Sequence, residues 1–369
     1  MSLTLQELHV TNYERVIHVT NPSNGLQAII AIHNTTLGPA LGGIRILPYK
    51  SFADALSDVL SLSKGMTYKA AFAGIGLGGG KSVIIRDSEK GLPRELLWDF
   101  GEAMHSLQGQ YICSEDMNCT VKELAIIHQK TKYITGLSHS KSSGNPSPFT
   151  AYGVFLGMEA LCMQLFGSRS LKDKKIVIQG LGSVGKDLAS RLFWAGAELV
   201  VADLNQERAA TVAKELGATQ ISVEESFSQP CDILAPCAIG KVINKNTIPL
   251  LQCRAIGGCA NNILHTEEDG IALHKKGILY APDFVINGGG LINVAMELRP
   301  EGYNPVQSRK CINTIYDNLL SIFQVSEQAG CCTNQTALKL ASYRIAHHIG
   351  KRQISPHFHH SLIPESFHV

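Results

Sequence analysis

Apolar and polar positions follow two different patterns along the chain, one before and one after about residue 145. In the later part, short apolar runs alternate with segments whose apolar residues recur at helical spacing. Strands are predicted at residues 174–180, 197–203, 231–238, 254–260 and 277–287, and helices at residues 150–166 and 206–218. Such an alternation is typical of a parallel sheet covered by helices on both faces.

The earlier part is less regular. Strands are predicted at residues 26–33 and 82–87, and helices at residues 51–66 and 95–107. Ser51, followed three residues later by Asp54, predicts a helix N-cap. Residues 34–45 are rich in glycine and predict a loop. Residues 140–153 are dense in Ser, Gly and Pro and predict a hinge or linker between domains.

Length and composition limit the classes of protein that fit. A chain of 369 residues is too long for one ordinary core, so we expect a two-domain α/β protein that ends in two helices, at residues 305–329 and 334–349. The net charge of +2 gives no reason to expect nucleic acid or an acidic membrane as a partner. We expect no membrane span and no secretion signal, and therefore a cytoplasmic protein.

The cysteines and the terminal histidines do not predict a metal site. None of the ten cysteines forms the C-x2-C pairs of a zinc site, and several lie in apolar runs. We interpret them as reduced core thiols. His357, His359 and His360 are interpreted as a solvated chain end.

A dinucleotide fingerprint follows the strand predicted at 174–180. Gly180, Gly182 and Gly185 form G-x-G-x-x-G between this strand and a helix, and Asp203 ends the next strand. The first glycine allows a tight turn, the second lets a pyrophosphate approach, and the third packs helix against strand. A carboxylate at Asp203 suits a free ribose 2′-hydroxyl, so NAD is predicted rather than NADP. The other interpretation is a glycine turn that binds no ligand. Leu181, Ser183, Val184 and Leu204 complete the predicted cofactor-binding segment.

Two lysines lie in the apolar, glycine-rich stretch 65–82. A desolvated ammonium near a second cation is expected to have a lowered pKa, which would make Lys69 or Lys81 available as a base near neutral pH. The glycines before Lys81 would let a small ligand approach the amine. Two other interpretations remain: a phosphate-binding P-loop, which the sequence misses by one position at Ile75, and a glycine-rich turn with an exposed structural lysine.

Several ordered blocks of sequence resemble the Glu/Leu/Phe/Val dehydrogenase family of amino acid dehydrogenases. The resemblance runs from about residue 7 to 345 and is strongest to the leucine dehydrogenases. It is carried by residues 37–45, 64–71, 78–85, 114–118, 144–154, 180–185, 235–240, 260–262 and 280–294. So many blocks in one order are far more specific than any single motif.

This resemblance implies reversible oxidative deamination of an L-amino acid to a 2-oxo acid, ammonia and NADH. It implies that Lys69 holds the substrate carboxylate, that Lys81 activates the attacking water, and that Asp116 exchanges protons with the departing amino group. Without the resemblance, Asp116 could equally be the N-cap of a helix that Thr120 and Val121 open. The family pattern also places Thr150, Ala238, Ala260, Asn261 and Asn262 against the cofactor, and Asn262 near the substrate carboxylate.

The resemblance also implies a division of labour between the domains. Residues 1–145 would form an α/β substrate and oligomerisation domain, and residues 146–329 a Rossmann-like, doubly wound NAD-binding domain. The helices from about 330 to 369 would pack back on the first domain. The chain departs from the family pattern at Met117, Asn118, Cys119 and Met296. A homo-oligomer is expected.

The substrate side chain is predicted to be apolar. Leu41, Gly42, Met66 and Val294 would line its pocket, where a glutamate γ-carboxylate would stay unpaired. We expect leucine or another branched-chain amino acid, with phenylalanine or tryptophan as the alternative, because pocket volume alone discriminates weakly. A catalytically silent NAD-binding module is a third hypothesis, and it would not need Lys69, Lys81 and Asp116 together.

Overall fold

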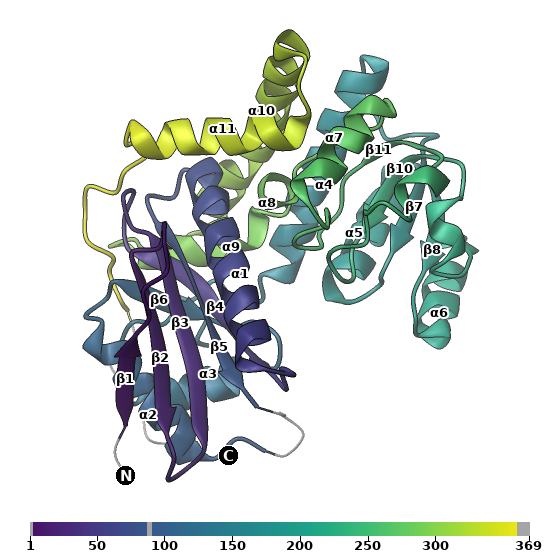
Figure 1. Cartoon of the computed structure of the whole chain (residues 1–369). Coiled ribbons are helices and arrows are strands. Elements are labelled where there is room, and N and C mark those ends of the chain that lie inside the picture. The colour runs from purple at the N-terminus through teal and green to yellow at the C-terminus, as the bar shows by residue number, and fades with distance from the viewer. Residues whose placement is uncertain (1–2, 87–90, 360–369) are drawn as a thin grey trace. The chain divides into compact units, whose positions relative to one another are not determined.

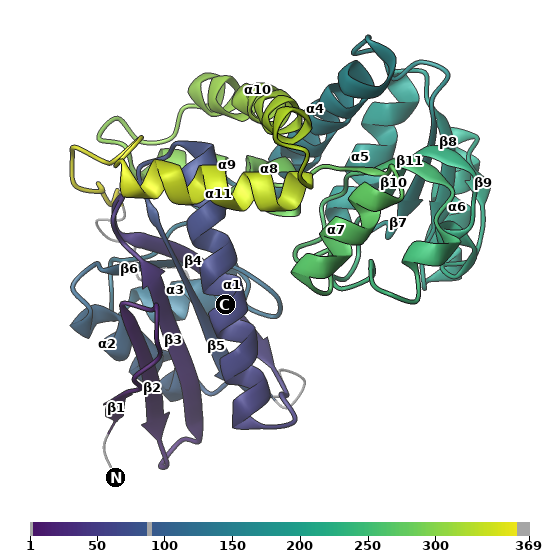
Figure 2. The ribbon, with the colours of Figure 1, turned by 45° about the horizontal axis from the view of Figure 1, so that its top comes forward.

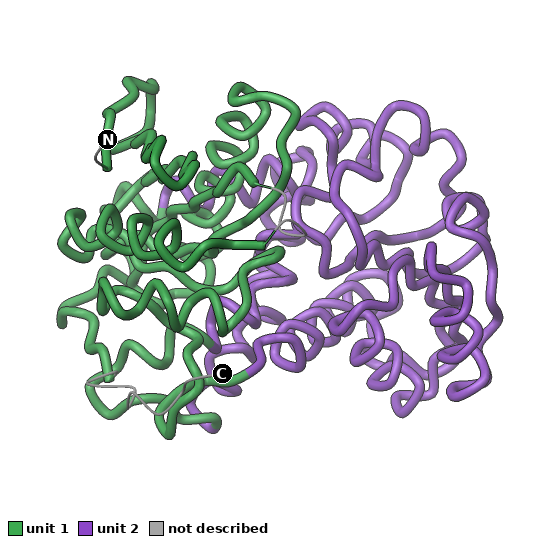
Figure 3. The backbone as a smooth tube through the Cα atoms, turned by 90° about the horizontal axis from the view of Figure 1, so that it is seen from below, with its two compact units in different colours: residues 1–144, 294–305, 344–369 green, residues 145–293, 306–343 purple. Residues whose placement is uncertain are grey.

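The structure, a computed structural model, describes residues 3–86 and 91–359. The chain forms two compact units, shown in different colours in Figure 3. Unit 1 contains residues 1–144, 294–305 and 344–369, and unit 2 contains residues 145–293 and 306–343. These bounds differ from the expected ones in two places: residues 294–305 group with unit 1 instead of unit 2, and the final return to unit 1 comes at Arg344 instead of about residue 330.

Unit 1 is a mixed six-stranded sheet with helices on both faces (Figure 1). Its elements are β1 (Thr4–Glu7), β2 (Arg15–Asn21), β3 (Leu26–Asn34), β4 (Ala40–Leu47), α1 (Phe52–Ala73), β5 (Gly78–Ile85), α2 (Arg94–Ser106), β6 (Tyr111–Ser114) and α3 (Val121–His128). The strand order is β1-β2-β3-β5-β4-β6. β5 runs antiparallel to β3 and parallel to β4, and β4 runs parallel to β6.

The alternation of side chains along β3 explains why both faces of this sheet are covered. Ile29 packs in one apolar cluster with Val59 of α1, whereas the next residue, Ile30, packs in another with Leu96 and Phe100 of α2. Successive residues of a strand point to opposite faces, so the apolar run from Ala28 to Ile32 needs a helix on each side of the sheet. Ser51 caps α1 by accepting a hydrogen bond from the Asp54 backbone N–H at 3.1 Å, which confirms the predicted cap.

Three predicted boundaries in this unit are wrong. Residues 40–47, predicted within or beside a loop, form β4; β5 begins at Gly78 rather than at 82; and α1 continues past 66 to Ala73. Gly74 then ends α1 in the left-handed conformation, with φ of 62°. Glycine has a low strand propensity, so the glycine-rich sequences of β4 and β5 do not look like strands. Pairing with neighbouring strands nevertheless holds them in the sheet.

Unit 2 is a doubly wound parallel sheet (Figure 2). Its elements are α4 (Ser147–Phe166), β7 (Lys175–Gln179), α5 (Ser183–Trp194), β8 (Glu198–Ala202), α6 (Gln206–Leu216), β9 (Thr219–Gln220), β10 (Cys231–Pro236), β11 (Cys253–Ile256), α7 (Glu267–Lys275), β12 (Leu279–Tyr280) and α8 (Asp283–Ile286). α9 (Gly289–Ala295), α10 (Pro305–Ala329) and α11 (Thr333–Ala346) cross the limits between the units.

The strand order of unit 2 is β12-β11-β10-β7-β8-β9, and all neighbouring strands are parallel. Counted from β7, this is the order 6-5-4-1-2-3 of a Rossmann fold, with its topological switch point between β7 and β10. The predicted α/β fold with two domains is therefore confirmed. The strand predicted at 277–287 is only two residues long, because the chain turns at Pro282, the N-cap of the short helix α8.

The helix α4 is the one described helix that is long and apolar enough to cross a membrane, although the sequence analysis expected no such run. Half of its most apolar window is buried inside the protein. A Cβ added at Gly153 would lie 2.8 Å from Ile315, and one at Gly157 would lie 2.3 Å from Ile286. The apolar composition of α4 is thus explained by packing within unit 2.

Candidate active site

The glycines before Lys81 allow β5 to pack closely against α1 and β6. A Cβ at Gly79 would lie 2.1 Å from the Thr67 backbone nitrogen of α1, and one at Gly80 would lie 2.7 Å from the Tyr111 ring of β6. The expectation that these glycines leave room for a ligand is therefore wrong. The P-loop and glycine-turn interpretations are also wrong, because residues 78–85 form a strand inside the sheet.

Lys81 and Asp116 form a largely buried ion pair. Lys81 lies on β5, opposite Ala31 of β3, and its ammonium donates a hydrogen bond to Oδ2 of Asp116. The side chains are 7% and 19% exposed, respectively, so Lys81 is not an exposed structural lysine. A Cβ at Gly43 of β4 would lie 2.7 Å from the Asp116 Cβ, so the missing side chain lets the carboxylate lie against β4.

The loop that carries Asp116 is tied to the end of β4. Asn118, at φ of 59°, donates a side-chain hydrogen bond to the Ile46 carbonyl at 3.0 Å, and the Ile46 N–H donates to the Met117 carbonyl at 3.0 Å. These bonds show how the loop closes although its sequence departs from the family pattern. Thr120 caps α3 in a capping box with Glu123. The alternative that Asp116 is the N-cap is therefore wrong.

Two cations keep Asp116 ionised. Burial by itself raises the pKa of Asp116, but the charges of Lys81 and Arg45 outweigh burial and lower the pKa below its ordinary value. Nη2 of Arg45 lies 3.9 Å from Oδ1 of Asp116, and the Met117 N–H donates to the same oxygen at 2.6 Å. Sequence reasoning missed Arg45, although it lies in a block that carried the family resemblance.

Of the predicted substrate-binding residues, Asn262 lies in unit 2 and the others belong to unit 1. Lys69 is half-buried on α1, two residues after Thr67, and Thr67 lies against Gly79, which is two residues before Lys81. Leu41 of β4 is buried and pairs in register with Gly79, while Met66 of α1 is half-buried and Val294 of α9 is buried. A Cβ at Gly42 would lie 1.8 Å from the Gly80 carbonyl oxygen, so Gly42 permits the approach of β4 to β5.

The three fingerprint glycines of unit 2 have three different surroundings. Gly180 forms a turn with φ of 102°, and a Cβ added there would lie 2.6 Å from Ala238. A Cβ added at Gly185 would lie 2.0 Å from the Gly180 carbonyl oxygen. At Gly182, the residue before α5, an added Cβ would meet nothing within 4 Å, and no side chain caps this helix. The open face at Gly182 and the uncapped N–H groups fit a dinucleotide pyrophosphate.

Asp203 is a buried acceptor at the end of β8. Its carboxylate accepts hydrogen bonds from the Leu181 N–H at 2.7 Å and the Asn205 N–H at 2.8 Å. Arg208 of α6 forms an ion pair with it at 3.4 Å. Arg208 is five residues beyond Asp203 in sequence, and the first turn of α6 brings its guanidinium to the carboxylate. Leu204, the next residue, is 82% exposed.

The remaining predicted cofactor residues follow the ends of the strands or lie at the start of α4. Ala238 follows β10, and Ala260, Asn261 and Asn262 follow β11. The segment after β10 meets that after β11, because the Lys241 N–H donates to the Asn262 carbonyl at 2.6 Å. Asn287, which sequence reasoning missed, donates to the Ala260 carbonyl at 3.2 Å and to the Asn261 side chain at 3.0 Å. Its own buried Oδ1 has no hydrogen-bond partner among the residues that the structure describes. Thr150 lies on α4 and donates to the Pro146 carbonyl at 3.1 Å.

The cysteines are free thiols, as predicted.

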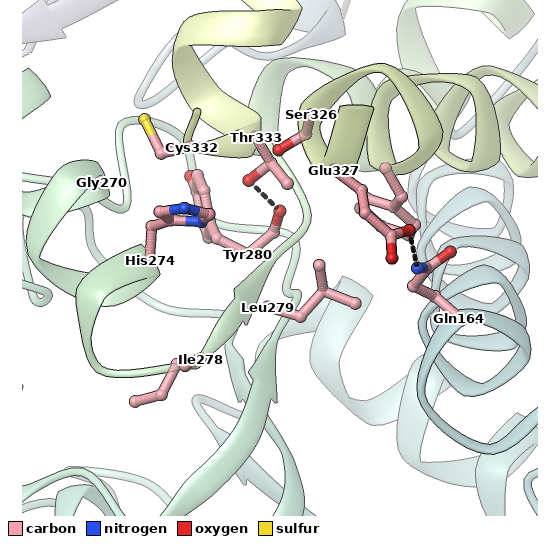
Figure 4. Close-up of a pocket in the computed structure, with 12 residues that line it drawn as sticks. Gln164, Gly270, His274, Ile278, Leu279, Tyr280, Ser326, Glu327, Cys332 and Thr333 are labelled. Carbon is pink, nitrogen blue, oxygen red and sulfur yellow. Dashed lines mark hydrogen bonds between the residues drawn. The ribbon is translucent and has the colours of Figure 1, made fainter. Parts of the chain in front are cut away.

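A separate cavity of about 250 Å³ lies in unit 2 between α7, β12 and α10 (Figure 4). Leu279, Phe323, Thr333 and Glu327 contribute to its lining, which includes none of the predicted site residues. The Thr333 hydroxyl donates a hydrogen bond to the Tyr280 carbonyl at 2.6 Å, which fixes this side chain in the cavity wall.

Comparison with known proteins identifies the family. Residues 13–133 match the model "Glu/Leu/Phe/Val dehydrogenase, dimerisation domain", and residues 198–314 match "Glutamate/Leucine/Phenylalanine/Valine dehydrogenase". The chain is 46% identical over 335 residues to leucine dehydrogenase from Geobacillus stearothermophilus, covering 90% of this chain and 91% of the relative. Phenylalanine dehydrogenase from Bacillus thermotolerans is 42% identical and covers 98% and 94%.

A solved structure gives the same result. The crystal structure of L-tryptophan dehydrogenase from Nostoc punctiforme superposes with a TM-score of 0.79 at 43% identity and covers 91% of this chain and 97% of that one. A unit with a Rossmann sheet and a second α/β unit with a buried lysine–aspartate pair define a nicotinamide-nucleotide-dependent amino acid dehydrogenase. The chain belongs to the Glu/Leu/Phe/Val dehydrogenase family.

Proposed function

We propose that this protein catalyses the NAD-dependent, reversible oxidative deamination of an apolar L-amino acid, most readily leucine or another branched-chain amino acid. The observation that carries the proposal is the buried contact between Lys81 and Asp116. Such a pair can take up and release a proton beside a bound substrate. A catalytically silent NAD-binding protein would have no use for an amine and a carboxylate desolvated together.

Each proposed residue meets one chemical need of the reaction. The ammonium of Lys69 binds the substrate carboxylate. A nicotinamide cofactor held by unit 2 would accept the hydride that leaves the substrate Cα. Lys81, as a neutral amine, takes a proton from the water that attacks the resulting iminium carbon. Asp116, ionised at rest, takes a proton from the substrate ammonium before the hydride leaves, and it returns this proton to the nitrogen as the C–N bond breaks. The hydroxyl left by the attacking water releases its proton to solvent as the carbonyl forms, which yields ammonia and the 2-oxo acid.

Unit 2 is the proposed cofactor-binding unit, and unit 1 the proposed substrate-binding and oligomerisation unit. The cofactor would be held by the loop of Gly180, Gly182 and Gly185, with Asp203 at the ribose. NAD is favoured because the Asp203 carboxylate would repel a 2′-phosphate, and the charge of Arg208 is already partnered by Asp203. A homo-oligomer is supported by the match of residues 13–133 to a dimerisation domain. We also propose a cytoplasmic location, which fractionation of cells would test.

An apolar substrate is supported by Leu41, Gly42, Met66 and Val294. An aromatic amino acid is the second candidate, because the relatives that are named tryptophan and phenylalanine dehydrogenases are nearly as similar as those named leucine dehydrogenase. The test is NAD reduction at alkaline pH with L-leucine, L-valine, L-isoleucine, L-phenylalanine, L-tryptophan and L-glutamate, repeated with NADP. Highest kcat/KM for a branched-chain substrate with NAD supports the proposal. Absence of reduction with every amino acid would overturn it.

A further inference from the structure

Arg45 connects Asp116 to a second carboxylate that the proposed reaction does not use. Nη2 of Arg45 lies 3.9 Å from Oδ1 of Asp116, and its Nη1 donates to Oδ2 of Asp58 at 3.0 Å. Arg45 lies on β4 and Asp58 on α1, so the guanidinium spans the two elements. Its side chain is only 15% exposed.

Asp58 is itself held from a second side. The Tyr49 hydroxyl donates to Oδ2 of Asp58 at 2.7 Å. Burial, followed by the hydrogen bond to Asp58 and its charge, raises the pKa of Tyr49 well above the ordinary value. Tyr49 therefore remains a hydrogen-bond donor at working pH, and Asp58 remains an acceptor for Arg45. This arrangement limits the positions that the guanidinium can take.

The backbone of β4 directs Arg45 and Asp116 to each other. The Asp116 Cβ lies over Gly43, where an added Cβ would come within 2.7 Å of it. Residues 43 and 45 are two apart on one strand, so their side-chain positions face the same side of the sheet. The carboxylate thus lies on the side of β4 from which Arg45 projects.

Arg45 and Lys81 differ in a way that matters for the reaction. Lys81 changes its charge whenever it accepts or releases a proton, whereas a guanidinium stays charged throughout. The titratable or charged groups that act on Asp116, or on which Asp116 acts, include two cations and four other groups: Lys81 of β5, Arg45 of β4, Tyr111 of β6, Tyr49, Glu115 and Cys119. Of these, Arg45 is the cation whose charge does not depend on the step of the reaction.

We propose that Arg45 is a positioning residue, whose permanent charge orients Asp116 and favours the return of its carboxylate to the ionised form after each proton exchange, whatever the charge on Lys81. Asp58 and Tyr49 hold the guanidinium for this task. The inference rests on the proposed function, because it gives Asp116 and Lys81 their roles in proton transfer. Arg45 itself does not touch the substrate and acts through Asp116.

The test combines a direct titration of Asp116 with steady-state kinetics. The protonated carboxyl is followed by infrared difference spectroscopy in Arg45→Met, Arg45→Lys and the wild type, and is assigned with Asp116→Asn. Arg45→Met is expected to raise the pH at which Asp116 titrates by about 1–3 units. It should also lower kcat by about 10- to 100-fold, with little change in KM. Arg45→Lys keeps the charge and should restore most of the titration shift.

Arg94→Met is the matched control, because Arg94 is an exposed residue of α2 that bonds to Gln129. If Arg45→Met does not fold, Asp58→Asn provides a second variant: it keeps the cation, loosens it, and should shift the Asp116 titration in the same direction by less. An unchanged Asp116 titration in the variant that folds would overturn the inference. If none of the amino acids tested supported NAD reduction by the wild type, the proposed function would fail. The infrared titration would still decide whether Arg45 controls the ionisation of Asp116.

Discussion

Lys81 and Asp116 are 35 residues apart in sequence, and their side chains are in contact inside unit 1. Lys81 is brought there by β5, which lies between β3 and β4, and Asp116 by the turn after β6. Neither residue could be desolvated alone without a large cost, because a buried unpaired charge is strongly unfavourable. Their proximity therefore depends on the correct order of the strands, and it defines the site proposed for proton transfer.

Replacing Lys81 by alanine should abolish most turnover without affecting the cofactor unit. We expect Lys81→Ala to lower kcat by about 100- to 10 000-fold, the range typical of a lost general base. NADH affinity, measured by fluorescence titration, should be unchanged. Lys130→Ala is the control, because Lys130 forms an exposed ion pair with Glu102 in the same unit. Wild-type turnover in Lys81→Ala would remove the role given to this lysine.

Replacing Lys69 by alanine should act on substrate binding. The loss of one charge-assisted contact to the substrate carboxylate is worth about 1.5–3 kcal/mol, which corresponds to a rise in KM of about 10- to 150-fold. A smaller effect is expected on kcat. Lys64→Ala is the matched control on the same helix, where Lys64 is exposed. Equal values of KM in wild type and Lys69→Ala would contradict the assignment.

Gly182 and Gly185 should respond differently to an added methyl group. In Gly185→Ala the new Cβ would lie 2.0 Å from the Gly180 carbonyl oxygen, and relief of this overlap costs about 1–3 kcal/mol or more. We expect a lower thermal unfolding midpoint. In Gly182→Ala the methyl group meets nothing within 4 Å, so the midpoint should be unchanged. NADH affinity should nevertheless fall about tenfold, or about 1.4 kcal/mol, because the methyl group obstructs the pyrophosphate. Unaltered NADH affinity in Gly182→Ala would place the cofactor elsewhere.

Asp203 should decide between the two nicotinamide cofactors. Asp203→Asn removes the charge that would repel a 2′-phosphate and leaves Arg208 without its anionic partner. The preference for NAD over NADP, measured as the ratio of kcat/KM values, should fall by about 10- to 100-fold. Glu207→Gln on the exposed side of α6 is the control. A wild-type enzyme that already prefers NADP would show the proposed cofactor to be incorrect.

His33 should make unit 1 less stable in mild acid. Burial, and then the charge of Lys64, lower the pKa of His33 to about 4, so the folded protein keeps it neutral while the unfolded chain protonates it near pH 6.5. The unfolded state therefore binds more protons between these values, and stability is lost as pH falls from about 6.5 to 4. Urea unfolding at pH 7, 6 and 5 should show a weaker pH dependence for His33→Gln than for the wild type.

The control for this measurement is His105→Gln, at an exposed histidine of α2. It should keep the pH dependence of the wild type. His33 also forms a hydrogen bond of 2.8 Å with the Thr67 hydroxyl, so His33→Gln will be less stable at every pH. If the free energy of unfolding depended on pH equally in the wild type and in His33→Gln, the titration of His33 would not contribute to the loss of stability in acid.

Much of the fold of unit 2 was predictable from the sequence, because its signals are local. Gly180, Gly182 and Gly185 lie within six consecutive residues, and the turn, the open face and the helix contact follow from their spacing. Arg208 was overlooked because its contact with Asp203 depends on where α6 begins, which sequence patterns locate poorly.

In unit 1 the sequence by itself determined which residues have the right chemistry: two lysines among apolar neighbours and an aspartate in a family block. Only the tertiary structure decided that the glycine-rich segments are β4 and β5, that Lys81 forms an ion pair with Asp116, and that Arg45 lies close to the same carboxylate. The physical reason is that strand pairing and burial depend on residues far apart in the chain. Glycines, which locally favour a turn, are here the positions where neighbouring strands and α1 come closest.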